Sequence, residues 1–270
     1  MKRGLRLVKT KSINLRDVIV DHPLNVLNEI QNKGNSVFVL LNIPISKCRT
    51  QIWNTLEIDK NPFVKTIVSH NKTKSLDYES SEISNYYNNY QPNGASDVLR
   101  IPNNNGLKNI PAIGYVLPWE NFTYKELINK RERIALSENK KAGKTIGLSS
   151  GYTDFGPVSE EKGELEFKRL IEVYENIKNK GYKEKLHHPD GGISGYFLIG
   201  EDNKWCFFIK SGKHRSYALS ALGYTHIPVS LELSLETIKH ISTIEFWPQV
   251  KNELFTELEA RLLVKNILNL

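Results

Sequence analysis

Residues 205–229 read WCFFIKSGKHRSYALSALGYTHIPV, and the succession of residue types along this stretch decides the fold. The run 205–210 is short, apolar and aromatic, which is typical of a buried strand. A Ser-Gly pair at 211–212 interrupts it, and from Lys213 onward the apolar positions recur with a helical period. Gly223 follows the last of these positions, where helices commonly end, and a second extended run comes after it. The stretch therefore predicts a strand, a tight turn, a helix and another strand.

The start of the predicted helix carries the chemistry. A helix that begins after a glycine turn exposes unpaired N–H groups and the positive end of its dipole, and this end binds anions, phosphate above all. Lys213, His214 and Arg215 occupy the first turn, although charged cations there are unfavourable by about 0.3–1 kcal/mol each. An anionic ligand would explain them. The alternative is that Arg215 pairs with a nearby carboxylate while the other two are solvated.

Several short motifs resemble those of the ParB/sulfiredoxin-like superfamily. Residues 212–215 (GKHR) match its G-x-H-R turn, and 222–229 (LGYTHIPV) match its closing "LGY…IPV". Upstream, 170–182 (LIEVYENIKNKGY) looks like the family's L-x-x-S-I-x-x-x-G helix, and 195–199 stands where the family has its first central strand. The resemblance covers roughly residues 164–229.

The resemblance implies a fold and a ligand. The fold would be α/β (α+β), with a small mixed sheet flanked by helices and, in this chain, an N-terminal α/β extension. In that superfamily the turn and the helix start hold nucleotide phosphates. Its members include CTP-binding partition proteins, ATP-using sulfiredoxins and free-serine kinases. Carried over by position, the nucleotide- and phosphate-binding residues would be Ser211, Gly212, Lys213, His214 and Arg215.

The chain also departs from each branch of that family. Sulfiredoxins have a nucleophilic cysteine where this chain has Lys213, so reduction of a sulfinic acid is not expected. The serine kinases have an acidic residue where this chain has Ser211, so a catalytic base would have to come from elsewhere. In the partition proteins a helix-turn-helix DNA-binding domain follows. The roughly forty residues after 229 in this chain are short for such a domain together with a dimerisation module.

Composition narrows the class of protein. Of 270 residues, 39% are hydrophobic and 25% charged, as in an ordinary folded protein. The formal net charge of +7 permits nucleic acid or a phosphorylated ligand, but the lysines are spread along the chain, which disfavours nucleic acid without excluding it. Two cysteines, Cys48 and Cys206, fit a reducing compartment. Because no signal peptide or membrane span is recognisable, we expect a cytoplasmic protein.

Three segments are predicted along the chain. Residues 1–121 form an N-terminal α/β region of unknown role, in which the apolar run 36–43 reads as a buried strand. Residues 122–158 combine a helix with a mobile loop or linker, and 159–270 form the nucleotide-binding domain with a C-terminal helix that could mediate a homodimer. Helices are predicted at 48–56, 123–139, 164–179 and 255–270.

Acidic and tyrosine residues outside the turn complete the candidate site. Glu164 or Glu166, near the start of a predicted helix, could act as a general base or a metal ligand, and Glu166 with His214 is the predicted catalytic pair. The alternative is that these glutamates face solvent. Acceptor binding is assigned to three clustered tyrosines, which could stack on a sugar or a base. The alternative is that they pack against the body of the protein. They are Tyr86, Tyr87 and Tyr90.

Three further motifs are interpreted without a specific chemistry. His187, His188 and Asp190 could bind a metal only with a third, distant ligand, so a loop that shapes the site is favoured and no metal ligands are predicted. The sequence AGKT at 142–145 resembles the end of a Walker A loop, and DFG at 154–156 resembles the metal-binding triplet of kinases. Both lack the surrounding motif and are interpreted as chance matches.

The sequence thus predicts a nucleoside-triphosphate-binding enzyme. We expect an ATP-dependent kinase that uses Mg²⁺ and phosphorylates a small hydroxyl-bearing metabolite or a sugar. Two alternatives stay open: a ParB-like nucleotide-gated DNA-binding protein, and a non-catalytic module that binds a protein or glycan.

Overall fold

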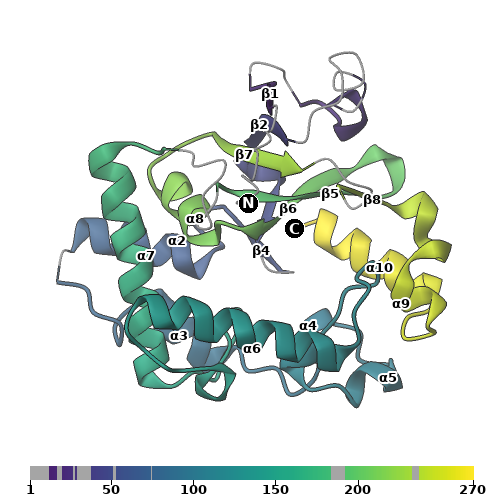
Figure 1. Ribbon diagram of the computed structural model, residues 1–270, viewed down its shortest axis with the longest axis horizontal. Coiled ribbons are helices and arrows are strands. Elements are labelled where there is room, and N and C mark those ends of the chain that lie inside the picture. The colour runs from purple at the N-terminus through teal and green to yellow at the C-terminus, as the bar shows by residue number, and fades with distance from the viewer. Residues whose placement is uncertain are drawn as a thin grey trace, which may run out of the picture.

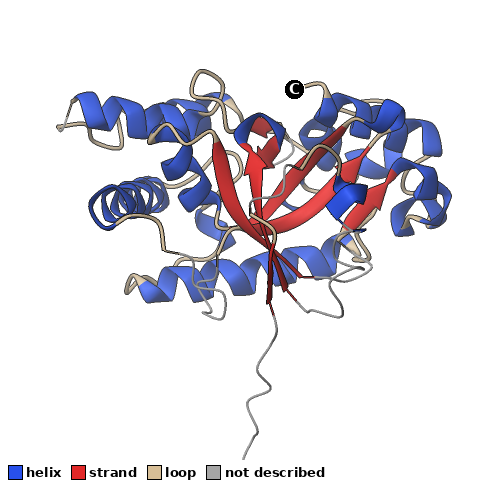
Figure 2. Cartoon of the chain, turned by 90° about the horizontal axis from the view of Figure 1, so that it is seen from above, coloured by secondary structure: helices blue, strands red, loops and turns tan. Residues whose placement is uncertain are grey.

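A mixed sheet runs through the centre of the molecule and helices lie on both sides of it (Figure 1 and Figure 2). The fold is seen in a computed structural model of the chain. The residues that the structure describes are 12–16, 20–26, 28, 38–50, 53–73, 75–183, 192–232 and 237–270. His187, His188 and Asp190 lie outside the described residues.

The strands follow the order β1-β2-β7-β5-β6-β3-β4, and β8 pairs with β5 away from this path. Their bounds are β1 Ser12–Asn14, β2 Phe38–Pro44, β3 Cys48–Thr50, β4 Asn54–Thr55, β5 Ser194–Ile199, β6 Trp205–Ser211, β7 His226–Glu232 and β8 Ile238–His240. Parallel and antiparallel pairs are mixed: β5 and β6 are antiparallel, whereas β3 and β6 are parallel. The protein is therefore of the mixed α/β class.

The stretch that decides the fold forms the predicted elements. β6 ends at Ser211, Gly212 adopts φ +80°, and helix α8 spans Lys213–Ala221. Gly223, with φ +82°, follows the helix and leads into β7. The left-handed conformation at both ends explains why glycine stands there.

N-terminal residues complete the sheet. β2 pairs with β7 along seven residues, with Leu41 opposite Val229, and β3 pairs with β6. The prediction of a helix at 48–56 is therefore wrong. A three-residue strand is too short to show the alternation of apolar and polar residues that is typical of strands. Its partner β6 also lies far along the chain, so no local pattern indicates the pairing. The division of the chain into three segments stays a prediction.

Alternation along β6 builds a core on each face of the sheet. Phe207 and Ile209 belong to the core beneath α2 (Pro62–Lys72), α7 (Glu160–Lys180) and α8, whereas Cys206 and Phe208 belong to the core on the opposite face. Successive strand residues point to opposite faces, so one aromatic strand supplies both cores. Burial raises the pKa of Cys206 to about 12, which fits a core residue and not a nucleophile.

The remaining helices surround these cores. They are α3 Glu82–Asn89, α4 Ala95–Leu99, α5 Asn105–Lys108, α6 Tyr124–Lys141, α9 Pro248–Lys251 and α10 Glu257–Leu268. The predicted helices at 123–139, 164–179 and 255–270 are confirmed as α6, α7 and α10. Leu258 and Leu262 of α10 are exposed, and a dimer through this helix stays a prediction. None of the helices in the described part of the chain has the length and apolar character to cross a bilayer.

Candidate functional site

The start of α8 is shaped by Gly212. A Cβ atom at this position would lie 2.9 Å from the Cα of Ile193 and 3.0 Å from the carbonyl oxygen of Gly192, so a larger residue would collide with backbone. No side chain caps the helix, and its first turn contains no acidic residue. In contrast, side chains cap α2, α3, α6, α7 and α10. The first N–H groups of α8 therefore lack the capping oxygen that the other long helices have.

Lys213 reaches from this turn to Asp154. Its Nζ lies 2.8 Å from Oδ1 of Asp154, whose side chain is 7% exposed, while the lysine side chain is 28% exposed. The aspartate lies on the loop between the short 3₁₀ helix Leu148–Ser150 and α7. Lys213 is therefore not merely solvated: a nearly buried carboxylate holds its ammonium group.

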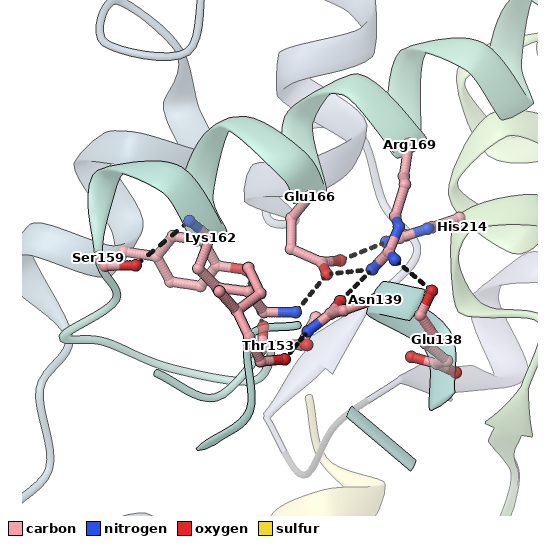
Figure 3. Close-up of polar contacts among 10 residues, drawn as sticks. Glu138, Asn139, Thr153, Ser159, Lys162, Glu166, Arg169 and His214 are labelled. Carbon is pink, nitrogen blue, oxygen red and sulfur yellow. Dashed lines mark hydrogen bonds and ion pairs between the residues drawn. The ribbon is translucent and has the colours of Figure 1, made fainter. Parts of the chain in front are cut away.

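His214 reaches the other way, to Glu166 on α7 (Figure 3). Its Nε2 lies 3.4 Å from Oε2 of Glu166, and the other carboxylate oxygen contacts Lys162 Nζ at 2.6 Å and Arg169 Nη1 at 3.0 Å. Burial alone would raise the pKa of Glu166, but the hydrogen bond from His214 and the charges of His214 and Lys162 hold it well below its usual range. Glu166 is thus an ionised, buried carboxylate that fixes the imidazole, whereas Glu164 is exposed.

Arg169 connects this cluster to the end of α6. Its Nη1 donates to Oδ1 of Asn139 at 2.9 Å and its Nη2 donates to the carbonyl of Glu138 at 2.6 Å (Figure 3). Asn139 is fully buried and donates in turn to the carbonyl of Ile146. The network therefore fixes α6, α7 and α8 relative to one another around Glu166.

A small pocket opens beside Asp154. It is a shallow recess, partly open to solvent, with about 20 Å³ of room, enough for little more than a water molecule. Most of the lining side chains are aromatic. Asn54 adds an amide and Asp154 a carboxylate. The lining residues are Trp53, Asn54, Tyr86, Tyr90, Val98, Tyr115, Asp154 and Phe155. Asp154 therefore belongs both to this pocket and to the lysine contact at the start of α8.

Tyrosine hydroxyls hold the Asp154 segment in place. Tyr86 donates to the carbonyl of Asp154 at 2.7 Å, Tyr87 donates to the carbonyl of Thr153 at 3.0 Å, and Tyr115 lies 3.3 Å from Oδ2 of Asp154. Burial raises the pKa of Tyr86 well above its usual range, so its hydroxyl remains a donor. The second half of the predicted mobile loop is thus anchored, and it forms part of the candidate site.

The three predicted acceptor-binding tyrosines separate into two groups. Tyr86, on α3, and Tyr90, the residue that caps the C-terminal end of this helix, line the pocket. Tyr87 is 1% exposed and packs in the core with Ile83, so it offers no surface to a ligand and its assignment to the acceptor is corrected. The reason is helix phase: residues i and i+4 share a face, and the pair 83 and 87 faces inward.

The remaining predicted residues lie around the turn. Ser211 is exposed at the end of β6, and Arg215 is half-buried one position beyond His214. In the described part of the chain no three His, Cys, Asp or Glu side chains gather in a way that could hold a metal ion.

Sequence reasoning missed Asp154, Lys162 and Arg169 as parts of the site. The available signal for Asp154 was its place in the glycine- and aromatic-rich run GYTDFG at 151–156, where a lone acidic residue is conspicuous. Lys162 and Arg169 stand at i−4 and i+3 from Glu166, a spacing at which helical side chains meet.

Comparisons of this chain with protein-family models, with curated proteins and with solved structures found no match. The resemblance to the ParB/sulfiredoxin-like superfamily stays a prediction from the motifs.

Proposed function

We propose that this protein binds a nucleoside triphosphate, ATP by expectation, at the start of α8 and transfers its terminal phosphoryl group to a hydroxyl of a small molecule. One observation carries the proposal: an uncapped helix start bears a lysine and a histidine, and a buried carboxylate orients each of them. The longer helices α2, α3, α6, α7 and α10 have a polar side chain as a cap at this place.

The oriented side chains of Lys213 and His214 suit a polyanion as hydrogen-bond donors. An ammonium group has three N–H donors, and the contact of Lys213 with Asp154 uses one of them. The remaining donors are available to phosphate oxygens because the lysine side chain is partly exposed. His214 is likewise 23% exposed while its imidazole contacts Glu166.

Phosphoryl transfer requires mainly positioning and neutralisation of charge. In the proposal, Gly212 and the first N–H groups of α8 cradle phosphate, and the side chains of Lys213, His214 and Arg215 bind and neutralise it. Glu166 is a positioning residue that acts through His214. The likeness of this turn to the G-x-H-R turn of the ParB/sulfiredoxin-like superfamily supports the same assignment.

Magnesium is proposed to arrive with the nucleotide. In phosphoryl-transfer enzymes this ion is bound by phosphate oxygens, water and one or two protein side chains, and a dedicated protein cage is not required. The hydroxyl of Ser211, on the exposed end of β6, is suited to hydrogen-bond a phosphate or a metal-bound water.

A thermal-shift titration tests nucleotide binding directly. ATP, ADP, CTP and GTP would each be added with and without Mg²⁺, and a nucleotide at about 100 times its Kd should stabilise the fold by about 2.7 kcal/mol. Lys213→Ala should weaken that binding about ten- to a hundredfold, because it removes a charged hydrogen bond to phosphate. The matched control is Lys168→Ala, whose side chain is 72% exposed on α7.

Two results would count against the proposal. In the first, the wild-type protein unfolds cooperatively but no nucleotide raises its melting temperature. This result would favour the non-catalytic binding module. The other is equal nucleotide affinity in folded Lys213→Ala and in the wild type, which would move the phosphate site away from α8.

A further inference from the structure

We propose that the outward-facing side of α6 binds an anionic lipid bilayer and holds the protein at its surface. This side, the outer arc of α6, carries four cations: Lys125, Lys130, Arg133 and Lys140. The inference goes beyond the proposed function and does not depend on the nucleotide site.

The inner side of α6 is fixed to the body of the protein. Leu127 and Asn139 are buried, and Arg131 donates to the carbonyl of Ile113 while its guanidinium lies 4.1 Å from the ring centroid of Tyr115. Residues three, four or seven positions apart share a helical face, so these contacts turn the outer arc to solvent. In Figure 1 α6 faces the viewer and no other helix or strand crosses it. The arc is therefore an accessible surface, about 22 Å long from its first cation to its last.

The positive charge of the outer arc has no partner within the described part of the chain. None of its four cations forms a salt bridge with a described residue. The exposed faces of other long helices differ, since Lys168 lies 3.9 Å from Glu172 on α7 and Arg261 lies 3.6 Å from Glu257 on α10. A row of cations without such partners is complementary to an anionic surface.

The acidic residues of α6 do not cancel this charge. Glu126 uses its carboxylate in the capping box at the start of the helix. The carboxylate of Glu132 accepts from the N–H of Leu148 at 2.6 Å. Glu138 lies toward α7, where its carbonyl accepts from Arg169. The outer arc therefore keeps a net positive charge.

Exposed apolar side chains favour lipid over nucleic acid as the partner. Ile134 is 47% exposed and Leu136 is 40% exposed, and residues two apart on a helix lie on opposite flanks of the arc. Phe122, 36% exposed, precedes the helix, and Nζ of Lys130 lies 4.4 Å from the centroid of its ring. Membrane-surface helices combine Lys and Arg with Phe or Leu, whereas contacts to a phosphate backbone come from cationic and polar groups. The arc thus fits a bilayer with anionic headgroups.

Co-sedimentation of the full chain with lipid vesicles tests the inference. The vesicles consist of phosphatidylcholine, with or without phosphatidylglycerol, and we expect binding to the anionic vesicles alone, weakening as salt is added. Each Lys or Arg near an anionic surface contributes about fivefold to the affinity, so Arg133→Gln combined with Lys140→Gln should weaken binding about 25-fold. The matched control, Lys60→Gln combined with Lys168→Gln, removes the same charge from side chains that are 57% and 72% exposed elsewhere, and it should leave binding nearly unchanged.

A second pair of substitutions tests the apolar contribution without changing charge. Ile134→Ser combined with Leu136→Ser should weaken vesicle binding about tenfold, because less apolar surface enters the interface. Binding of a DNA duplex, measured by gel shift, should be weaker than vesicle binding in the wild type. Thermal unfolding shows that each variant is folded.

Three results would overturn the inference. The first is equal sedimentation of the wild type with and without phosphatidylglycerol, and the second is an equal loss of binding in the two pairs of cation substitutions. The third is a DNA duplex that binds more tightly than the vesicles and depends on Arg133 and Lys140, which would make α6 a nucleic-acid surface. The ATP thermal shift separates this inference from the proposed function: nucleotide binding without vesicle binding contradicts only the inference, and vesicle binding without nucleotide binding contradicts only the proposed function.

Discussion

Glu166 is the most confined charge of the site, and its stability depends on its partners. The carboxylate is ionised in the core because His214, Lys162 and Arg169 surround it. Lys162 is equally buried, with its side chain 3% exposed. Removing one member of a buried ion pair leaves the other uncompensated, which is far more destabilising than losing a surface pair.

Glu166→Gln should therefore lower the free energy of unfolding by about 3–5 kcal/mol, measured by urea denaturation at pH 7. The matched control is Glu172→Gln on the same helix. Its carboxylate is 59% exposed and lies 3.9 Å from Lys168, so its removal should change stability by less than about 0.5 kcal/mol. Equal effects of the two substitutions would mean that Glu166 is not held as a buried charge.

The same residue predicts a dependence of stability on pH. The pKa of Glu166 is lower in the folded protein than its ordinary value of 4.5, so at acid pH the unfolded chain binds this proton more readily. The stabilisation is complete above pH 4.5 and is lost as the pH falls toward the folded pKa. The difference in unfolding free energy between wild type and Glu166→Gln should therefore shrink between pH 7 and about pH 3. A difference that stays constant across this range would contradict the depressed pKa.

At the scale of the element, α8 owes its position to glycines at both ends. Gly212 and Gly223 have nearly equal positive φ values, +80° and +82°. A Cβ atom on Gly223 would meet nothing within 4 Å, whereas one on Gly212 would press on the backbone of residues 192–193. Both positions thus require a left-handed backbone conformation, and only Gly212 also lies close to the backbone of another segment.

This pair yields a matched substitution. Gly223→Ala should cost about 1–2 kcal/mol, the penalty of a left-handed conformation for an L-residue. Gly212→Ala should cost more, because the helix start must also shift away from Ile193, and it should weaken nucleotide binding in addition. Urea denaturation and the ATP thermal shift measure the two effects. Equal losses of stability, with ATP binding intact in both variants, would show that the close approach at Gly212 is unimportant.

Elements with strong local signals could be predicted from the sequence. β6, α8 and β7 follow from an aromatic run, a glycine turn and a helical period, all of which lie within 205–229. Elements and contacts that depend on distant partners could not. β3 exists because β6 pairs with it, and Asp154 meets Lys213 across 59 positions of sequence. Likewise, no local pattern states which of neighbouring tyrosines on α3 faces the core, because that depends on what packs against the helix.

At the scale of the whole molecule, the sheet joins the two ends of the chain. β2, from the N-terminal region, pairs with β7 along its full length, and the two strands contribute Leu41 and Leu231 to the same core. α7 and α8, which carry the site, pack on that core. The site is therefore supported by residues from both the predicted N-terminal region and the predicted nucleotide-binding domain.

This shared core predicts one cooperative unfolding transition for both regions. Leu41→Ala and Leu231→Ala remove equivalent buried side chains, 0% and 1% exposed, from adjacent strands. Each should destabilise the protein by about 2–5 kcal/mol, and both should shift the same calorimetric transition because neither strand keeps its core without the other. The ATP-induced stabilisation should persist in both variants, since neither residue belongs to the site. Two transitions, each shifted by only one of the substitutions, would instead mean that residues 1–121 and 159–270 unfold separately, and that the start of α8 keeps its geometry without the N-terminal strands.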